Sequence, residues 1–209
     1  MPDKVCDDNQ FLADVASHSM SVKLDDGLYR NVVFRAADKS WNHWFEIVTW
    51  PGCLVIHGDM GTWTFSRVDD MFRFFRDSEG LKINPHYWCE KLRAGTGSEG
   101  MDLAKNFDAD EFRKRCFERI SDCFSDEPDK VVEITDALKD DLYYEEFEWD
   151  LKRAVYNFKH KDYQFDGCDM PDGKVWSYHY LWCCYAIVWA IQQYDAAKSS
   201  TMRELESGK

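Results

Sequence analysis

The feature that most constrains the fold is a long apolar segment near the C-terminus, at residues 175 to about 194. At helical spacing its bulky side chains are spread around the whole circumference: Trp182, Tyr185, Val188 and Trp189. A helix that is apolar on almost all sides is stable only where other elements cover it, so we expect it at the centre of a core. Its longest apolar run, residues 180–191, is too short to span a bilayer.

The first third of the chain predicts an antiparallel meander of four or five strands. Five short runs are rich in β-branched and aromatic residues: 21–24, 28–35, 44–50, 53–57 and 62–66. The pairs Asp26-Gly27 and Pro51-Gly52 supply turns between them. In the run 44–50 neither face is purely polar, so we expect each face of the sheet to be covered at least in part.

Beyond residue 69 the apolar spacing becomes helical. Short helices are predicted at 69–75 and 87–92, and a Gly-rich linker follows at 95–100. Asp108 and Glu111 resemble a capping box at the start of a longer helix, which ends before Pro128. Residues 131–158 indicate one long or two consecutive helices with an apolar stripe that includes Leu138 and Phe147.

These patterns predict an α+β fold: an N-terminal antiparallel meander packed with helices, followed by an acidic helical portion. The linker divides the chain into residues 1–94, with the sheet and short helices, and residues 101–209, with the buried helix at 175–194. The alternative is one composite domain.

Charge is concentrated in residues 99–172, which contain 22 Asp and Glu against 11 Lys and Arg. Their net charge of −11 accounts for most of the whole-chain −13. Because apolar residues at helical spacing run through the same stretch, it is not a disordered acidic tail. One interpretation is that these acids are the solvated outer faces of helices, which improve solubility.

The other interpretation is an array of carboxylates that binds a positively charged partner protein. The candidate residues are Asp126, Glu127, Asp129, Asp136, Asp140, Asp141, Glu145, Glu146, Glu148 and Asp150. Direct binding of nucleic acid is disfavoured, because phosphate contacts require a positive surface. The only tight basic cluster, Arg113-Lys114-Arg115, lies inside the acidic segment.

No motif in the sequence names a reaction: G-x-S-x-G, H-E-x-x-H and the P-loop are missing. Gly95, Gly97 and Gly100 spell G-x-G-x-x-G, but a dinucleotide site needs a strand before it within a parallel unit, and we predict a helix and an antiparallel sheet. A zinc site could in principle use the four residues His86, Cys89, His179 and Cys183, although both pairs lie among aromatic residues typical of packing. We therefore expect no catalytic residue, no metal and no cofactor.

The N-terminal residues are acidic and lack the basic region and apolar run of a secretory signal. A cytoplasmic protein with eight reduced cysteines and no membrane segment is therefore expected.

Three segments carry a resemblance: Trp44-Phe-Glu-Ile-Val-Thr-Trp-Pro-Gly52, His57-Gly-Asp-Met-Gly-Thr-Trp63 and Asp70-Met-Phe-Arg-Phe-Phe-Arg76. They resemble a family of uncharacterised bacteriophage and prophage proteins over about residues 20–95. The resemblance transfers no catalytic residues. It implies a context, because small phage accessory proteins often block host defence such as CRISPR complexes and restriction enzymes.

Together these features predict a phage-encoded, non-enzymatic inhibitor of anti-CRISPR or anti-restriction type, acting in the cytoplasm of a bacterial host. It would occupy the basic nucleic-acid-binding site of a defence protein or nucleoprotein complex. One alternative is a metal- or nucleotide-dependent accessory enzyme. Another is a self-associating structural protein that uses exposed aromatic residues such as Trp41 and Trp44.

Overall fold

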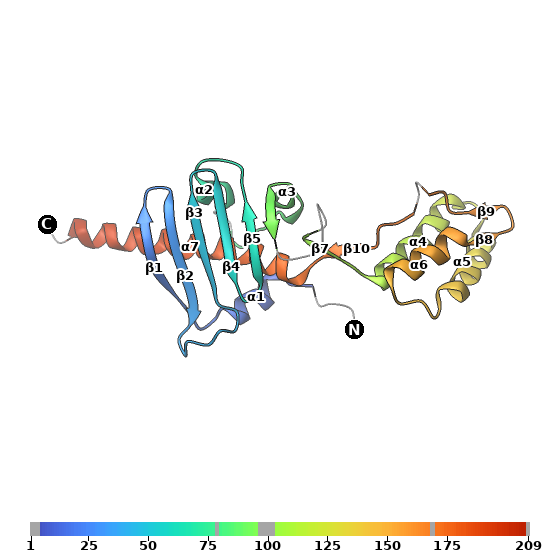
Figure 1. Ribbon diagram of the computed structural model, residues 1–209, viewed down its shortest axis with the longest axis horizontal. Helices are drawn as coiled ribbons and strands as arrows, with labels where there is room; N and C mark the ends of the chain where they lie inside the picture. Colours follow the sequence, from blue (N-terminus) through green and yellow to red (C-terminus); the bar gives the residue numbers. More distant parts are fainter. Residues whose placement is uncertain (1–4, 78–79, 96–102, 168–169, 208–209) are drawn as a thin grey trace. The chain divides into compact units, whose positions relative to one another are not determined.

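A computed structural model of the chain describes residues 5–77, 80–95, 103–167 and 170–207 (Figure 1). The chain forms two compact units. The sheet unit comprises Asp3–Ala104 and Trp176–Lys209, and the helical unit comprises Lys105–Val175. This division differs from the boundary expected at residues 95–100, because the last helix belongs with the sheet. The reason is physical: an apolar helix needs an apolar surface to cover it, and the sheet provides one.

The sheet unit contains a six-stranded antiparallel sheet in the order β1-β2-β3-β4-β5-β6. Its strands are β1 (His18–Asp26), β2 (Tyr29–Ala36), β3 (Phe45–Trp50), β4 (Cys53–Gly58), β5 (Gly61–Phe65) and β6 (Leu92–Gly95). The α+β fold and the meander of the first five strands are confirmed. Strand β6 lies where the second short helix was predicted to end. Strand β6 can pack against β5 because Gly95 has no side chain. A Cβ atom on residue 95 would lie 2.5 Å from the Trp63 ring, which is too close.

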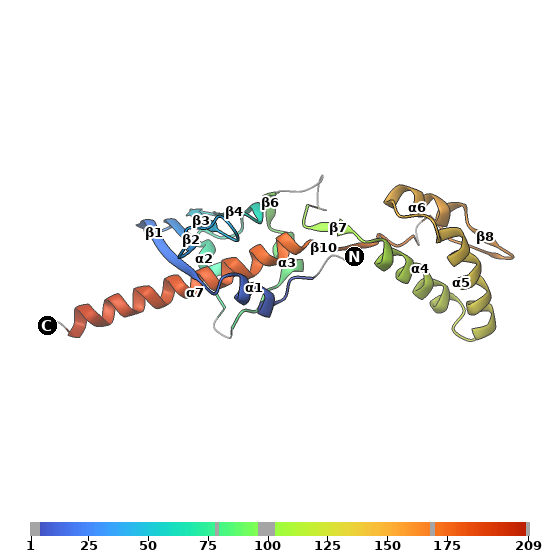
Figure 2. The same ribbon diagram turned by 90° about the horizontal axis from the view of Figure 1, so that it is seen from below.

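Helices cover one face of this sheet (Figure 2). They are α1 (Asp8–Asp14), α2 (Met71–Phe75), α3 (Pro85–Cys89) and α7 (Tyr178–Ser207). The first three begin at side-chain caps, in which Asp7, Asp70 and Asn84 accept hydrogen bonds from backbone N–H groups of the first turn. Helix α7 begins later than predicted, because the residues before it form a strand, and it continues well beyond residue 194. None of the described helices is both long and apolar enough to cross a membrane.

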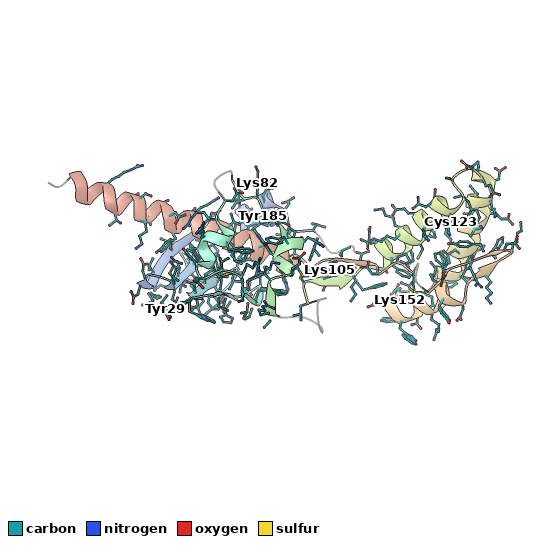
Figure 3. All side chains as sticks on the ribbon, turned by 90° about the horizontal axis from the view of Figure 1, so that it is seen from above. Tyr29, Lys82, Lys105, Cys123, Lys152 and Tyr185 are labelled. Atoms are coloured by element: carbon teal, nitrogen blue, oxygen red, sulfur yellow. The ribbon has the colours of Figure 1, made fainter. Side chains whose placement is uncertain are left out.

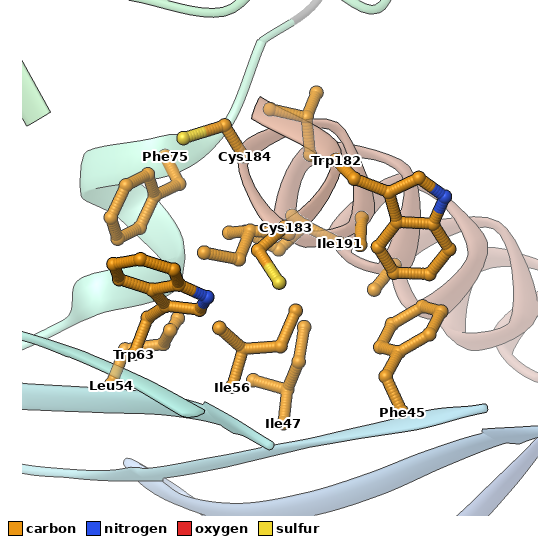
Figure 4. Packing of buried hydrophobic residues seen from close by; sticks show 14 of the residues in the cluster. Phe45, Ile47, Leu54, Ile56, Trp63, Phe75, Trp182, Cys183, Cys184 and Ile191 are labelled. Carbon is orange, nitrogen blue, oxygen red and sulfur yellow. The ribbon is translucent and has the colours of Figure 1, made fainter. Parts of the chain in front are cut away.

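The core of the sheet unit lies between α7 and the inner face of the sheet (Figure 4). Phe45 and Trp63 extend from the strands toward α7, where their rings meet those of Trp182 and Tyr180 at centroid distances of 5.6 and 5.3 Å. Figure 4 shows Cys183 extending from α7 toward the strands, close to Ile56. All these side chains are buried, so α7 occupies the central position expected of a helix that is apolar on all sides.

The opposite face of the sheet carries Val33, Val48 and Val55, which are half-buried, with Val48 and Val55 directly opposite in the register. No described helix of the sheet unit packs on this face (Figure 2). Cover on each face was expected, but in the described part of this unit only the inner face has it.

The helical unit contains α4 (Ala109–Cys123), α5 (Pro128–Leu142) and α6 (Glu148–Asn157). Four short strands accompany these helices: β7 (Lys105–Phe107), β8 (Lys159–His160), β9 (Tyr163–Gln164) and β10 (Lys174–Trp176), whose last residue already belongs to the sheet unit. Strand β8 pairs with β9, and β10 pairs with β7. A second core joins the three helices through Phe112, Cys116, Ile120, Ile134, Leu138, Leu142, Leu151 and Val155. The Asp108 side chain caps α4 by accepting a hydrogen bond of 2.7 Å from the Glu111 N–H.

The stretch 131–158 is therefore two helices, joined by a turn at residues 143–147. Assigning Phe147 to the apolar stripe was wrong. Phe147 is the N-cap of α6, its backbone is extended, and its side chain is exposed. The buried positions of α6 are Leu151 and Val155.

Candidate protein-interaction surface on the helical unit

The ten carboxylates predicted to bind a partner lie on one continuous part of the helical unit. They occupy the residues just before α5, α5 itself, the α5–α6 turn and the first turn of α6. All ten are exposed or half-exposed, because the buried positions of the same helices are taken by Ile134, Leu138, Leu142 and Leu151. Apolar spacing thus fixes which side of α5 faces solvent.

Four of the ten carboxylates form local ion pairs with exposed or half-exposed bases. The pairs are Glu127–Lys130, Asp136–Lys139, Glu148–Lys152 and Asp150–Arg153, with N–O distances of 3.8, 2.9, 2.7 and 2.8 Å. Figure 3 labels Lys152 on α6. Pairs of this kind contribute at most about 1 kcal/mol each to stability. They therefore neutralise charge locally but do not hold the side chains in one conformation.

The other six carboxylates form no ion pair with any described residue: Asp126, Asp129, Asp140, Asp141, Glu145 and Glu146. Over residues 126–150 there are eleven Asp and Glu against two Lys and no Arg. The surface therefore carries an uncompensated negative field that attracts cationic groups.

Four aromatic side chains at the α5–α6 turn were missed by the sequence analysis. Tyr143, Tyr144, Phe147 and Trp149 are 74–86% exposed. They alternate with acids in the run Tyr-Tyr-Glu-Glu-Phe-Glu-Trp-Asp, residues 143–150. We call these eight residues the corner surface. One sequence signal could have indicated their exposure. None of the four lies at helical spacing from both Leu142 and Leu151, the buried residues on either side.

The basic cluster Arg113-Lys114-Arg115 offers no positive surface. Arg113 pairs with Asp110 and also donates a hydrogen bond to the backbone carbonyl oxygen of Glu145. Arg115 pairs with Glu111 and Asp172, and Lys114 pairs with Glu111. These cations are engaged within the unit, and one of them anchors the α5–α6 turn to α4.

The four weak zinc candidates are not brought together. The Cys183 side chain is buried against the sheet, where its thiol lies 3.6 Å from the Met60 carbonyl oxygen, whereas His179 is exposed. The His86 ring contacts Trp176. Within the described residues, no three His, Cys, Asp or Glu side chains are grouped as metal ligands would be.

The described thiols most deeply buried are poor nucleophiles. Burial raises the pKa of the Cys116 thiol to about 12 and the pKa values of the Cys183 and Cys184 thiols well above their usual value. The thiolate is the reactive form, so these cysteines act as small apolar residues.

The G-x-G-x-x-G motif has only one glycine in the described part of the chain. Gly95 ends β6, which pairs antiparallel with β5, and its role there is close packing on Trp63. Gly97 and Gly100 lie outside the described residues. The parallel unit that a dinucleotide site requires is not formed by β5 and β6.

A half-buried polar cluster in the sheet unit surrounds Asp14. Its Oδ2 accepts hydrogen bonds from the Trp182 Nε1–H at 3.0 Å and the Tyr178 hydroxyl at 3.2 Å, and its Oδ1 accepts one from Gln10 at 2.9 Å. Burial, with the nearby Asp14 charge, raises the pKa of Tyr178. Because both carboxylate oxygens are occupied by donors of α1 and α7, the cluster fastens these helices together.

Comparisons with protein-family models, with curated proteins and with solved structures found no match for this chain. The resemblance of residues 20–95 to phage proteins therefore stays a prediction.

Proposed function

We propose that this chain is a phage-encoded, non-enzymatic inhibitor that binds a bacterial defence complex. The helical unit would present its carboxylates to a basic, nucleic-acid-binding surface of that complex. The observation that carries the proposal is the set of six unpaired carboxylates between Asp126 and Glu146, which lie on the solvent side of α5 or in the segments next to its ends. The resemblance of residues 20–95 supports the phage context.

The mechanism follows from charge. A cationic groove that binds phosphates attracts an ordered set of carboxylates in the same way, and an occupied groove no longer admits nucleic acid. Screening shortens the range of such attraction from about 10 Å at 0.1 M salt to about 3 Å at 1 M. Binding is therefore expected to weaken as salt rises and to be competed by nucleic acid.

Affinity capture from a bacterial host that carries CRISPR and restriction systems tests the proposal. The wild type is compared with Asp140→Asn/Asp141→Asn/Glu146→Gln, which neutralises three unpaired carboxylates. The matched control, Asp122→Asn/Asp162→Asn/Asp166→Asn, removes the same charge from three exposed positions of the same unit.

The first variant should lose the captured partner and the control should keep it, and free nucleic acid should release the partner from the wild type. Capture that resists high salt, or that survives the first variant unchanged, would contradict the electrostatic mechanism.

A second candidate function is self-association through the sheet unit. Strand β1 is an edge strand, and its Val22 and Leu24 side chains are exposed, as is Trp41. The irregular register between Val22 and Leu24 limits how much of this edge can pair with another strand. Sizing chromatography with light scattering should then show a dimer that Val22→Lys dissociates, and a wild type that stays monomeric at high concentration would exclude this function.

A further inference from the structure

The corner surface has a composition that solubility does not explain. A charged turn alone would keep the helical unit soluble, yet four of its eight residues are large aromatics whose side chains are at least 74% exposed. Isolated apolar side chains on a surface are ordinary, whereas several exposed aromatic residues within one short turn are typical of interaction sites. Aromatic residues are also enriched where interfaces hold most of their binding energy.

The core of the helical unit does not need these aromatic residues. The neighbouring buried positions, Leu142 and Leu151, already close the α5–α6 corner. Tyr143 and Tyr144 contact each other edge to face, with ring centroids 4.7 Å apart. Their outer faces are therefore available to a partner.

Some exposed or half-buried aromatic rings elsewhere in the chain have a cation of their own, although the exposed Tyr29, Trp50 and Tyr156 have none among the described residues. The Arg35 guanidinium lies 4.0 Å from the Trp41 ring centroid, and the Lys130 ammonium lies 4.0 Å from that of Phe124. At the corner surface, no cation of the described residues lies over Tyr143, Tyr144, Phe147 or Trp149. The corner surface thus combines aromatic faces that lack a cation with carboxylates, two of them the unpaired Glu145 and Glu146.

From this charge complementarity we propose that the corner surface binds an arginine-rich segment of the partner protein. The inference rests on the proposed function and identifies the chemistry of the partner's cations. A guanidinium group stacks flat on an aromatic ring while its N–H groups bind a carboxylate in a bidentate manner. A lysine ammonium can also lie over an aromatic ring, but it lacks both the planar face that stacks and the fork of donors that binds a carboxylate, so it should bind the same surface less tightly.

The test compares two peptides of equal length and charge, hexa-arginine and hexa-lysine, binding to the full-length protein at low salt. The wild type should bind hexa-arginine on the order of tenfold more tightly. The variant Tyr143→Ser/Tyr144→Ser/Phe147→Ser/Trp149→Ser should bind the two peptides with equal affinity. The control Tyr29→Ser/Trp50→Ser removes exposed aromatics of the sheet unit and should keep the preference.

Circular dichroism of the quadruple variant checks that α4–α6 remain folded, as expected for exposed positions. A charge variant, Glu145→Gln/Glu146→Gln, gives a second measurement and should weaken the binding of both peptides. Equal affinity of the wild type for the two peptides would overturn the arginine inference and leave the proposed function standing. Failure to bind either peptide would overturn both, and a preference that persists in the quadruple variant would overturn the role of the aromatic residues.

Discussion

His18 is a half-buried ring that ties stability to pH. Its ring stacks on Phe45, its Nε2 lies 3.0 Å from the His43 carbonyl oxygen, and its Nδ1 has no hydrogen-bond partner among the described residues. Burial lowers the pKa of His18 below 6.5, although the hydrogen bond to His43 and the charges of Asp14 and Asp38 oppose this shift. Nε2 must carry the proton of the neutral ring to donate to the carbonyl oxygen.

The sign of the pH effect follows from the lowered pKa. Below pH 6.5 the unfolded chain binds a proton at His18 that the folded chain does not yet bind. The free energy of unfolding should therefore fall as the pH drops through 6.5 and stop falling once the pH is below the pKa of the folded state. Urea denaturation between pH 7.5 and 5.5 measures this slope, which should be shallower in His18→Gln.

The exposed His57 provides the matched control, since His57→Gln should keep the slope of the wild type. If His18→Gln also kept it, another group would be responsible for the pH dependence.

At the scale of elements, the β4–β5 hairpin depends on the absence of a side chain at Gly58. A Cβ atom there would lie 2.2 Å from the Trp44 carbonyl oxygen and 2.7 Å from the Phe45 Cα, both backbone atoms that rotamer changes cannot move. Gly58→Ala is therefore expected to lower the free energy of unfolding by about 3 kcal/mol, at the upper end of overpacking costs. Gly27→Ala, where φ is +61° and no atom is within 4 Å, should cost about 1 kcal/mol. Chemical denaturation would contradict the argument if the two losses were equal.

Local sequence signals predicted the strands better than the elements that depend on distant partners. Turn pairs such as Asp26-Gly27 located the first five strands, because a hairpin is specified by adjacent residues. Strand β6 was missed because its partner β5 is distant in the sequence and α3 ends just before it. The local pattern predicted that α7 is buried, because its apolar residues surround the helix. It could not predict that the sheet is the surface that covers α7.

The candidate surface was predictable only in part, for a related reason. The carboxylates of α5 could be placed on the solvent side because Leu138 and Leu142 define the buried side. The aromatic residues could not, because Phe147 lies four residues before Leu151 and so imitates the helical stripe. Phe147 is exposed because α6 begins only at Glu148, one residue after it. Where α6 begins depends on the conformation of the α5–α6 turn, which the local sequence pattern does not specify.

At the scale of the whole molecule, the helical unit is inserted into the sequence of the sheet unit. The chain enters it after Ala104 and leaves it before Trp176, and these two points are neighbours. In the sheet unit, the Ser177 N–H donates a hydrogen bond of 2.8 Å to the Ala104 carbonyl oxygen. In the helical unit, the Asp108 N–H donates one of 2.9 Å to the Gly173 carbonyl oxygen. Each unit also has its own buried core. Both units thus meet the conditions under which domain insertions are tolerated, with neighbouring ends and a separate core.

We therefore expect each unit to fold without the other. In one protein, residues 105–175 are replaced by a short Gly-Ser linker that joins Ala104 to Trp176. In the other, residues 105–175 are produced alone. Circular dichroism and hydrogen exchange should show protected β2–β5 amides in the first and protected α4–α6 amides in the second, because their cores remain complete. If neither protein were protected, the two units would form one cooperative structure.

The same pair of proteins separates the roles of the two units in binding. If the carboxylates and aromatic residues of the α5–α6 region hold the partner, residues 105–175 alone should bind hexa-arginine as tightly as the full chain, since the contacts are local to that unit. The sheet unit with the linker should lose this binding while it stays folded. Retention of binding by the sheet unit would place the cation-binding surface on the strands or on α7, and the function of the acidic helices would then be solubility.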